Sequence, residues 1–225
     1  MNRNISVCFT LISIIYILCF IIDNFLEMKV ISILGFSTTA GTIIWPLVYI
    51  LDDCLTEVYG YQKARWVMWV TLLSNLLIVL LLQLVCWLPS AVEWENESAF
   101  NTIFSSTPRI FLATFISFFL GSTTNAIVLS IMKVKSSGKY FKLRAILSSV
   151  IGVAVESMIF FILAFYGELS ISEICKISFD SWILMILFEL LVLPITTKVV
   201  QYIKIKDSTD IYDENISYNP FSFKV

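Results

Sequence analysis

The sequence GFSTTAGTIIWPLVYILDDCLTEVYGYQKAR, at residues 35–65, brings acidic side chains to the end of an apolar run. Its apolar part ends at Asp52, Asp53 and Glu57, and a basic pair follows at positions 63 and 65. A carboxylate costs free energy at the edge of a hydrocarbon layer. An apolar segment that carries acids to that edge therefore indicates a functional site rather than a simple membrane anchor.

The first part of this stretch is unusual for a helix that faces lipid. It combines small and hydroxyl-bearing residues with a proline one turn later: Ser37, Thr38, Thr39, Gly41, Thr42 and Pro46. Proline removes a backbone donor, and non-helical backbone occurs at membrane depth only where protein or water satisfies it. We therefore expect a kinked or broken helix that lines a cavity, as in many transporters. A kinked helix whose hydroxyls bond to its own carbonyls fits the same residues.

The composition predicts an all-α integral membrane protein. Of 225 residues, 58% are hydrophobic and 14% are charged, which is incompatible with an ordinary soluble domain. There is no histidine, and the five cysteines lack C-x-x-C spacing. These absences argue against histidine-based metal sites and catalysis, so we expect no cofactor, no metal and no enzymatic activity. A net charge of −2 gives no sign of a nucleic-acid partner.

Six apolar runs are long enough to predict six transmembrane helices. They cover residues 5–22, 30–51, 66–88, 109–132, 143–166 and 182–203. We expect residues 1–203 to form one six-span domain among membrane lipids. Residues 204–225 are too polar to form a core of their own, and we expect them to be a disordered cytoplasmic tail.

The distribution of lysine and arginine predicts the orientation. When the loops are assigned to alternate sides, twelve of these residues, Arg3 and Lys224 among them, fall on one side and three on the other. Because basic residues accumulate on the cytoplasmic side, both termini are expected in the cytoplasm of a bacterium, with the chain in its inner membrane.

Two polar residues lie deep within predicted spans. Glu156 is near the middle of span 143–166, and Asn125 is in span 109–132. An ionisable residue near the bilayer midplane indicates a functional site by default. A protonated carboxyl group bonded to a neighbouring helix remains the structural alternative for Glu156.

The segments GFSTTAGT and WPLVYILDDCLTEVYGYQKAR resemble the queuosine precursor transporter family, whose members are also called vitamin uptake transporters. The family pattern is close to G-F-x-T-T-x-G-x, an apolar stretch with proline, then D-x-x-T-E-V-Y-G and a basic pair. Matching positions are Asp53, Thr56, Glu57, Val58, Tyr59, Gly60 and Arg65. A second pattern, S-x-x-x-[DE]-x-x-x-F-x-x-x-A-F, places Glu156 where the family usually has aspartate.

The resemblance implies uptake of 7-deazaguanines such as preQ0, preQ1 or queuine. One carboxylate can accept both adjacent donors of a guanine edge, and Glu156 or Asp53 fits this role. Aromatic rings can stack on the base. The predicted substrate contacts are Thr39, Trp45, Tyr49, Asp53, Asn125 and Glu156.

Asp53 and Glu57 are four residues apart and share a face if the helix continues past Leu51. We expect these acids and Arg65 to form a gate whose contacts break and reform during transport, with a proton as the coupling ion. A hydrated surface loop capped at Thr56 is the structural alternative.

Other classes of function remain open. The substrate-binding S component of an energy-coupling-factor vitamin transporter has a similar size and would need a partner ATPase module, because no Walker loop is present here. An intramembrane aspartyl protease would require a G-x-G-D pattern, which is absent. A scaffold protein would have no use for buried acids. A homo-oligomer is compatible with each reading.

Overall fold

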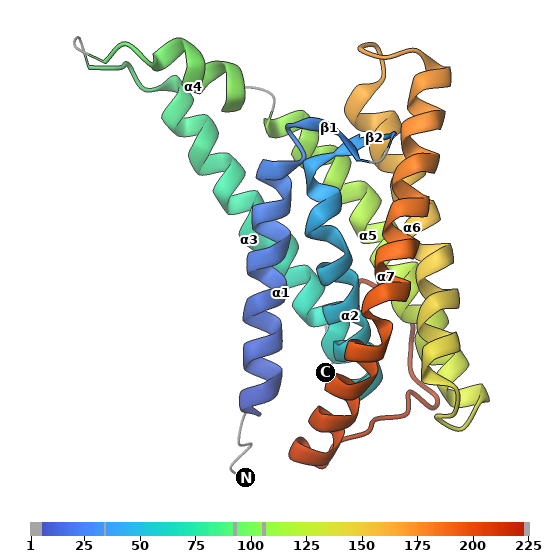
Figure 1. The fold of residues 1–225 in the computed structure, drawn as a ribbon. Coiled ribbons are helices and arrows are strands. Elements are labelled where there is room, and N and C mark those ends of the chain that lie inside the picture. Colours follow the sequence, from blue (N-terminus) through green and yellow to red (C-terminus); the bar gives the residue numbers. More distant parts are fainter. Residues whose placement is uncertain (1–5, 34, 92–93, 105–106, 223–225) are drawn as a thin grey trace.

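The computed structural model describes residues 6–33, 35–91, 94–104 and 107–222. Within these residues the chain forms seven α-helices, one short 3-10 helix and a two-stranded sheet (Figure 1). In chain order they are α1 (Val7–Leu26), β1 (Val30–Ile33), β2 (Phe36–Thr39), η1 (Ala40–Ile43), α2 (Trp45–Tyr59), α3 (Tyr61–Trp87), α4 (Glu97–Phe104), α5 (Thr107–Lys135), α6 (Phe141–Phe165) and α7 (Ile171–Asp207). The helical class is confirmed.

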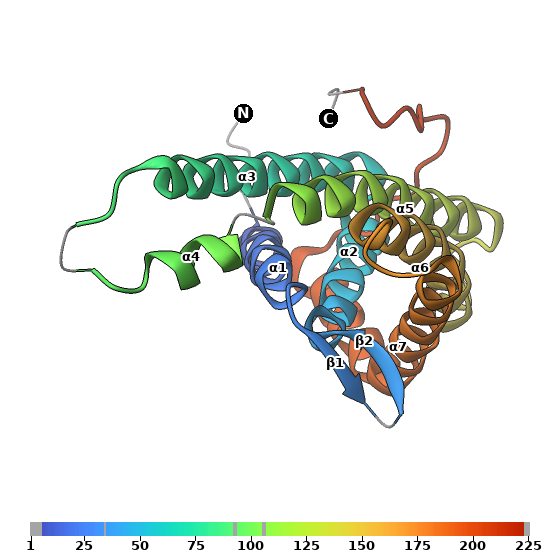
Figure 2. The ribbon, with the colours of Figure 1, turned by 90° about the horizontal axis from the view of Figure 1, so that it is seen from above.

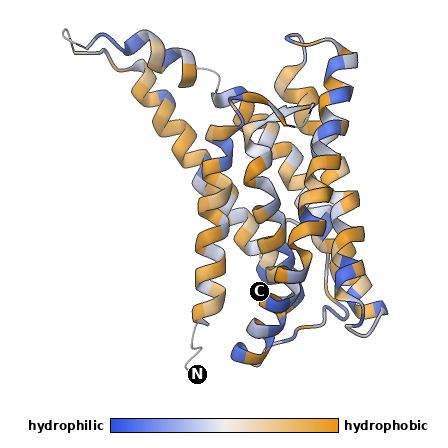
Figure 3. Ribbon diagram, viewed as in Figure 1, coloured by the Kyte–Doolittle hydropathy of each residue, from blue (hydrophilic) through white to orange (hydrophobic). Residues whose placement is uncertain are grey.

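Five segments of the described chain contain helices that are long and apolar enough to cross a membrane. They correspond to α1, α3, α5, α6 and α7, and apolar residues dominate these helices along most of their length (Figure 3). A hydrocarbon layer of about 30 Å requires about 20 helical residues, a length that each of the five reaches. The chain is therefore a multi-pass membrane protein, as five of the predicted spans indicated.

The second predicted span, residues 30–51, which we expected to be a kinked or broken helix, is α-helical only from Trp45 onward. β1 and β2 form an antiparallel hairpin in which Val30 pairs with Thr39 and Ile33 with Phe36. η1 follows, and α2 begins only at Trp45, with Pro46 in its first turn, where a missing N–H breaks no helical bond. The predicted interruption is real, but it is a hairpin that precedes the helix rather than a kink within it.

α2 ends at Tyr59, so the acids of the stretch lie within the helix and not beyond its end. Its 15 residues span about 22 Å, which is less than the hydrocarbon thickness. Every residue of α2 except Leu47 and Leu51 is buried, and Figure 2 shows the helix enclosed by the longer ones. Because neighbouring helices shield α2 from lipid, it can be short and polar.

α5 and α6 cross closely at two glycines. A Cβ atom on Gly121 would lie 2.6 Å from the Cβ of Glu156, and one on Gly152 would lie 2.8 Å from the Cβ of Asn125. Small residues let helices approach each other in membranes. This crossing therefore brings Asn125 and Glu156 close to each other and to α2.

The described part of the tail, residues 208–222, packs against the bundle, unlike the disordered tail that we expected. The Ile211 N–H donates to the Val58 carbonyl at 3.2 Å, and the Trp69 indole N–H donates to the Pro220 carbonyl at 2.8 Å. The ring of Phe221 also contacts that of Trp69, with centroids 5.8 Å apart. The tail thus lies across the ends of α2 and α3.

α1 begins and α7 ends at the same end of the bundle (Figure 1). Most of the basic residues that carry the charge bias belong to this end, at the start of α3, the end of α5, the start of α6 and the end of α7. Arg3 and Lys224, which we counted in that bias, lie outside the described residues.

The glycine crossing predicts a loss of stability in Gly121→Ala. The added Cβ would force α5 and α6 apart, because its nearest neighbours include the Cβ of Glu156 and the Gly152 carbonyl. Overpacking of this kind costs about 1–3 kcal/mol. Thermal unfolding of the purified protein in detergent should show a lower midpoint. Val128→Ile, which adds a methyl group at a half-buried position of α5, is the matched control, and equal midpoints for both variants would contradict this account.

Candidate functional site

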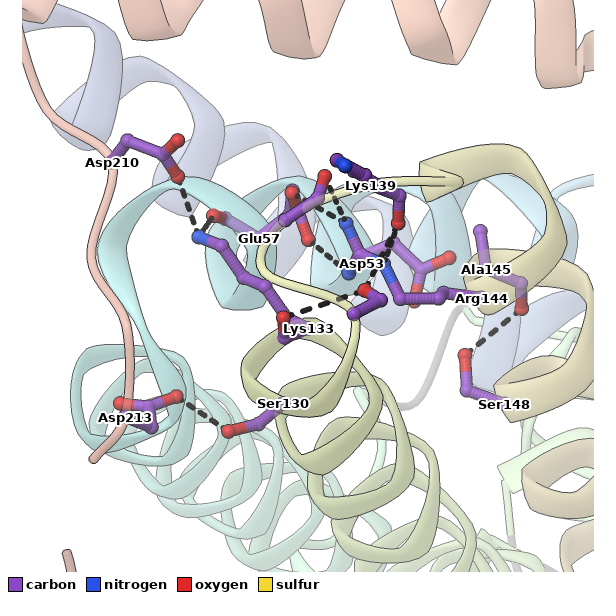
Figure 4. Close-up of polar contacts among 12 residues, drawn as sticks. Asp53, Glu57, Ser130, Lys133, Lys139, Arg144, Ala145, Ser148, Asp210 and Asp213 are labelled. Atoms are coloured by element: carbon purple, nitrogen blue, oxygen red, sulfur yellow. Dashed lines mark hydrogen bonds and ion pairs between the residues drawn. The ribbon is translucent and has the colours of Figure 1, made fainter. Parts of the chain in front are cut away.

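We call the end of the bundle where α1 begins and α7 ends the lower end, and the end that carries the β1–β2 hairpin the upper end (Figure 1). A buried ion-pair cluster around Glu57 holds the helices together at the lower end (Figure 4). Arg144 on α6 donates to the Glu57 carboxylate from two nitrogens, at 2.7 and 3.0 Å. Lys204 on α7 donates to the same carboxylate at 2.7 Å. Glu57 and Arg144 are almost fully buried. A two-pronged arginine–carboxylate pair is strong and directional, so the cluster joins α2, α6 and α7 at one point.

Lys133 on α5 ties the tail to this cluster. Its ammonium group donates to the backbone carbonyl of Glu57, to the Asp210 carboxylate at 2.6 Å and to the Ile211 carbonyl at 2.6 Å. Partial burial opposes the ionisation of Asp210, but the hydrogen bonds from Lys133 and Lys204 outweigh it and hold the pKa of Asp210 below its usual range. The tail is therefore attached as a charged partner of the buried lysine.

Arg65, the predicted cation of the gate, lies at a different place from the Glu57 cluster. Its Nη1 donates to the Asn219 carbonyl of the tail at 2.9 Å, and its guanidinium lies over the Tyr61 ring. The cations on Glu57 are Arg144 and Lys204. Sequence analysis did not single out either residue, because both appeared to belong to basic membrane-edge segments.

Two further acids of α2 bond to polar side chains of α5. The Asn125 amide donates to Asp53 at 2.8 Å, and the Ser122 hydroxyl donates to Asp52 at 2.9 Å. All four side chains are buried. The structure therefore brings together Asp53 and Asn125, two of the predicted substrate contacts, and the oxygen of the Asn125 amide has no hydrogen-bond partner among the described residues.

Glu156 lies at the α5–α6 crossing and accepts a hydrogen bond from the Tyr49 hydroxyl. Trp45, one turn before Tyr49 on α2, packs its ring against those of Phe20 and Phe118, with centroids 5.7 and 5.6 Å apart. Three of the predicted substrate contacts, Trp45, Tyr49 and Glu156, are thus neighbours, since Tyr49 contacts both the Glu156 carboxylate and the Trp45 ring.

Thr39 occupies the end of β2, where it is buried and immediately precedes η1. Its neighbour Thr38 makes hydroxyl contacts, 2.6 Å from the Ser181 hydroxyl of α7 and also with the Thr42 hydroxyl of η1. Thr39 is therefore part of the cover over the upper end of α2.

Sequence analysis missed an acid pair on α1. Asp23 and Glu27 follow the first predicted span, which ends at residue 22, but α1 runs to Leu26 and both side chains are buried. Glu27 accepts a hydrogen bond from Thr114 at 3.1 Å. The spacing of four residues, which puts both acids on one helix face, was the available signal. Glu189 on α7, which accepts from Ser149 at 2.9 Å, is a further buried acid outside the predicted set.

The buried acids follow α2 from one end of the bundle to the other. Among the described residues, the ion pairs of buried acids belong to Glu57 alone. Four other buried carboxyl groups accept hydrogen bonds from hydroxyl or amide groups: those of Asp52, Asp53, Glu156 and Glu189. No group of three or more Cys, Asp or Glu side chains in the described chain is arranged to hold a metal ion. This arrangement suits the binding of hydrogen-bond donors, protons or an organic cation.

A multi-pass bundle with a polar site enclosed near its centre is the architecture of a membrane transporter. Comparison with known proteins agrees. The family model described as "Putative vitamin uptake transporter" matches residues 39–199, which is more than half of the sequence. The chain belongs to this family, as the motifs at residues 35–65 indicated.

Two curated relatives carry related names. The "Probable queuosine precursor transporter" of Bacillus subtilis strain 168 is 26% identical over 145 residues, which are 64% of this chain and 63% of the relative. The "Queuosine precursor transporter" of Escherichia coli strain K12 is 24% identical over 155 residues, 69% of this chain and 67% of the relative. The chain thus spans about two thirds of the length of each. No solved structure matches it.

The Glu57 cluster predicts a large stability loss in Glu57→Gln. The change leaves the guanidinium of Arg144, which is 1% exposed, buried without a carboxylate. Breaking a buried pair in this way costs about 3–5 kcal/mol, and unfolding of the purified protein should show it. Glu168→Gln, which removes the exposed pair with Arg109, is the control and should change little. A similar small effect for both variants would show that the cluster does not hold the lower end together.

Proposed function

We propose that this protein is an uptake transporter for queuosine precursors, the 7-deazaguanines such as preQ0, preQ1 or queuine, across the bacterial cytoplasmic membrane. Membership of the vitamin uptake transporter family and the names of both relatives support this function. The observation that carries it is the buried carboxylate of Glu156, which accepts from an aromatic hydroxyl and has no described lysine or arginine at ion-pair distance.

Glu156 has the chemistry needed to recognise a guanine edge. A ring N–H and a neighbouring amino group on the base offer two parallel donors, and one carboxylate accepts both. In this structure the Tyr49 hydroxyl occupies the carboxylate, so the substrate would replace it. Trp45 offers an aromatic face beside this position, and stacking on such a ring contributes about 1–3 kcal/mol per base.

Asp53 and Asn125 form a second polar station nearer the lower end. The amide and the carboxylate bond to each other at 2.8 Å, and the partnerless amide oxygen adds an acceptor. We place these residues on the path that the base follows after leaving Glu156. Thr39, at the end of the hairpin, belongs to the outer cover of the same path.

The lower end of the bundle is assigned to the cytoplasm. It carries the excess of basic residues, which accumulate on that side, and both α1 and α7 reach it. In this proposal the hairpin, η1 and α2 together make the sixth pass, with both termini inside the cell.

The Glu57 cluster serves as the cytoplasmic gate. Its contacts join α2 to α6 and α7, and they must separate before a base can leave on this side. Asp53 lies one helical turn from Glu57 on α2, so its surroundings would change when the gate opens. Arg65 acts on the same gate through the tail, because it holds the Asn219 carbonyl.

A proton is the coupling ion in this proposal. Asp52, Asp53, Glu156 and Glu189 are buried and, within the described chain, have no cation at ion-pair distance. An unpaired charge in such surroundings is costly, and protonation removes it. Alternate loading and release of protons would then accompany the movement of the base.

The alternative is an S component of an energy-coupling-factor vitamin transporter, and the family description as a vitamin uptake transporter favours it as the second candidate. Such a component would need an ATPase module as its partner. The two candidates differ in whether this chain transports by itself.

Glu156→Gln should abolish uptake, because a neutral amide cannot accept both donors of the base. The measurement is queuosine in the tRNA of a strain that lacks both synthesis and uptake, fed preQ0, preQ1 or queuine in turn. Glu156→Asp should keep part of the activity, and the exposed-site variant Glu168→Gln should keep all of it. Normal queuosine levels in Glu156→Gln cells with unchanged membrane content would refute the assignment.

Proton coupling predicts that an imposed pH gradient, acidic outside, drives accumulation of the base in liposomes that contain only this protein. An uncoupler should collapse the accumulation to equilibrium, since the gradient is its only energy source. Accumulation only when ATP and an ATPase module are supplied would instead establish the S-component alternative.

A further inference from the structure

Asp23 and Glu27 are buried acids that the transport scheme above leaves unused. They lie four residues apart near the upper end of α1, and their side chains are 0% and 8% exposed. Neither carboxylate oxygen of Asp23 has a hydrogen-bond partner among the described residues. Glu27 accepts a hydrogen bond from the hydroxyl of Thr114.

Within the described chain, no lysine or arginine lies at ion-pair distance from either acid. Glu57 at the opposite end shows the contrast, because two cations of the chain neutralise it. Burying an unpaired carboxylate is costly. The charge of Asp23 and Glu27 is therefore not compensated by a lysine or arginine of the described chain, and a bound cation could compensate it.

The backbone of η1 packs closely against the pair at a glycine. A Cβ on Gly41 of η1 would lie 2.5 Å from Asp23 Oδ1 and 2.6 Å from Glu27 Cγ, so the missing side chain at this position lets both acids approach η1. Gly41 therefore brings the two acids against η1, the segment that precedes α2.

The pair also adjoins the proposed substrate position. Gly41 of η1 precedes Trp45, the first residue of α2, by four residues, and Tyr49 follows Trp45 by about one turn of α2. Phe20, one turn before Asp23 and Asn24 on α1, packs against the Trp45 ring. The acids thus stand on the Trp45 side of the Tyr49–Glu156 contact, at the outer end of the same path.

We propose that Asp23 and Glu27 form a subsite for a positively charged amine on the 7-substituent of the substrate. This inference rests on the proposed function. With the guanine edge on Glu156 and the ring beside Trp45, the substituent would point toward the α1 acids. A 7-aminomethyl base such as preQ1 carries the ammonium group that the pair needs, whereas the nitrile of preQ0 is neutral. The chain therefore selects cationic 7-deazaguanines over neutral ones.

The test compares uptake of preQ1 and preQ0 in wild type, Asp23→Asn, Glu27→Gln and the double variant. Charge-assisted hydrogen bonds to an ammonium correspond to roughly a ten- to hundredfold effect. We expect the double variant to lose preQ1 uptake by this factor. Its preQ0 uptake should stay within about twofold of wild type, because the neutral nitrile makes no charge-assisted contact that the variant could lose.

Asp23→Glu keeps the charge and should retain the preference for preQ1, and Glu168→Gln controls for loss of an exposed acid. Equal losses for both bases, or no loss for either, would overturn the subsite while leaving the transporter assignment in place. A wild-type chain that imports neither base would overturn both. If Asp23→Asn fails to reach the membrane, wild-type discrimination against preQ0 together with retained discrimination in Asp23→Glu supports the subsite, and equal uptake of both bases by wild type refutes it.

Discussion

The structure depends on the burial of three carboxyl groups on one central helix. Asp52, Asp53 and Glu57 lie on α2, which is enclosed by protein. Each needs a polar partner, because unsatisfied buried groups cost more than the bonds they could form. The partners come from other helices: Ser122 and Asn125 from α5, and a basic cluster from α6 and α7. The arrangement of the long helices is thus constrained by what α2 requires.

The same requirement explains the shape of the upper end. A polar helix cannot face lipid along its length, and α2 is too short to cross the membrane alone. The β1–β2 hairpin and η1 precede it; the hairpin strands pair with each other, and the Ser37 N–H donates to Asp180 of α7. The close α5–α6 crossing at Gly121 and Gly152 then lets Glu156 reach Tyr49.

Charge is compensated unevenly along the bundle. At the lower end Glu57 is locked by two cations, and the tail closes over them through Asp210. Toward the upper end the acids Asp23, Glu27 and Glu156 have hydroxyl partners or none. A structure closed by ion pairs on one side and short of positive charge on the other is suited to accept protons or a cationic solute from the upper side.

The sequence by itself determined the membrane class, five of the long helices and the family, because apolar length, composition and local motifs carry that information. It did not determine that residues 30–33 and 36–39 are strands, since a short apolar run has the same composition in a buried hairpin and in a helix. Only the tertiary structure decided that Arg144 and Lys204 neutralise Glu57, because these partners are 87 and 147 residues away along the chain. It also decided that Asp23 is buried, since burial depends on which helices pack against α1.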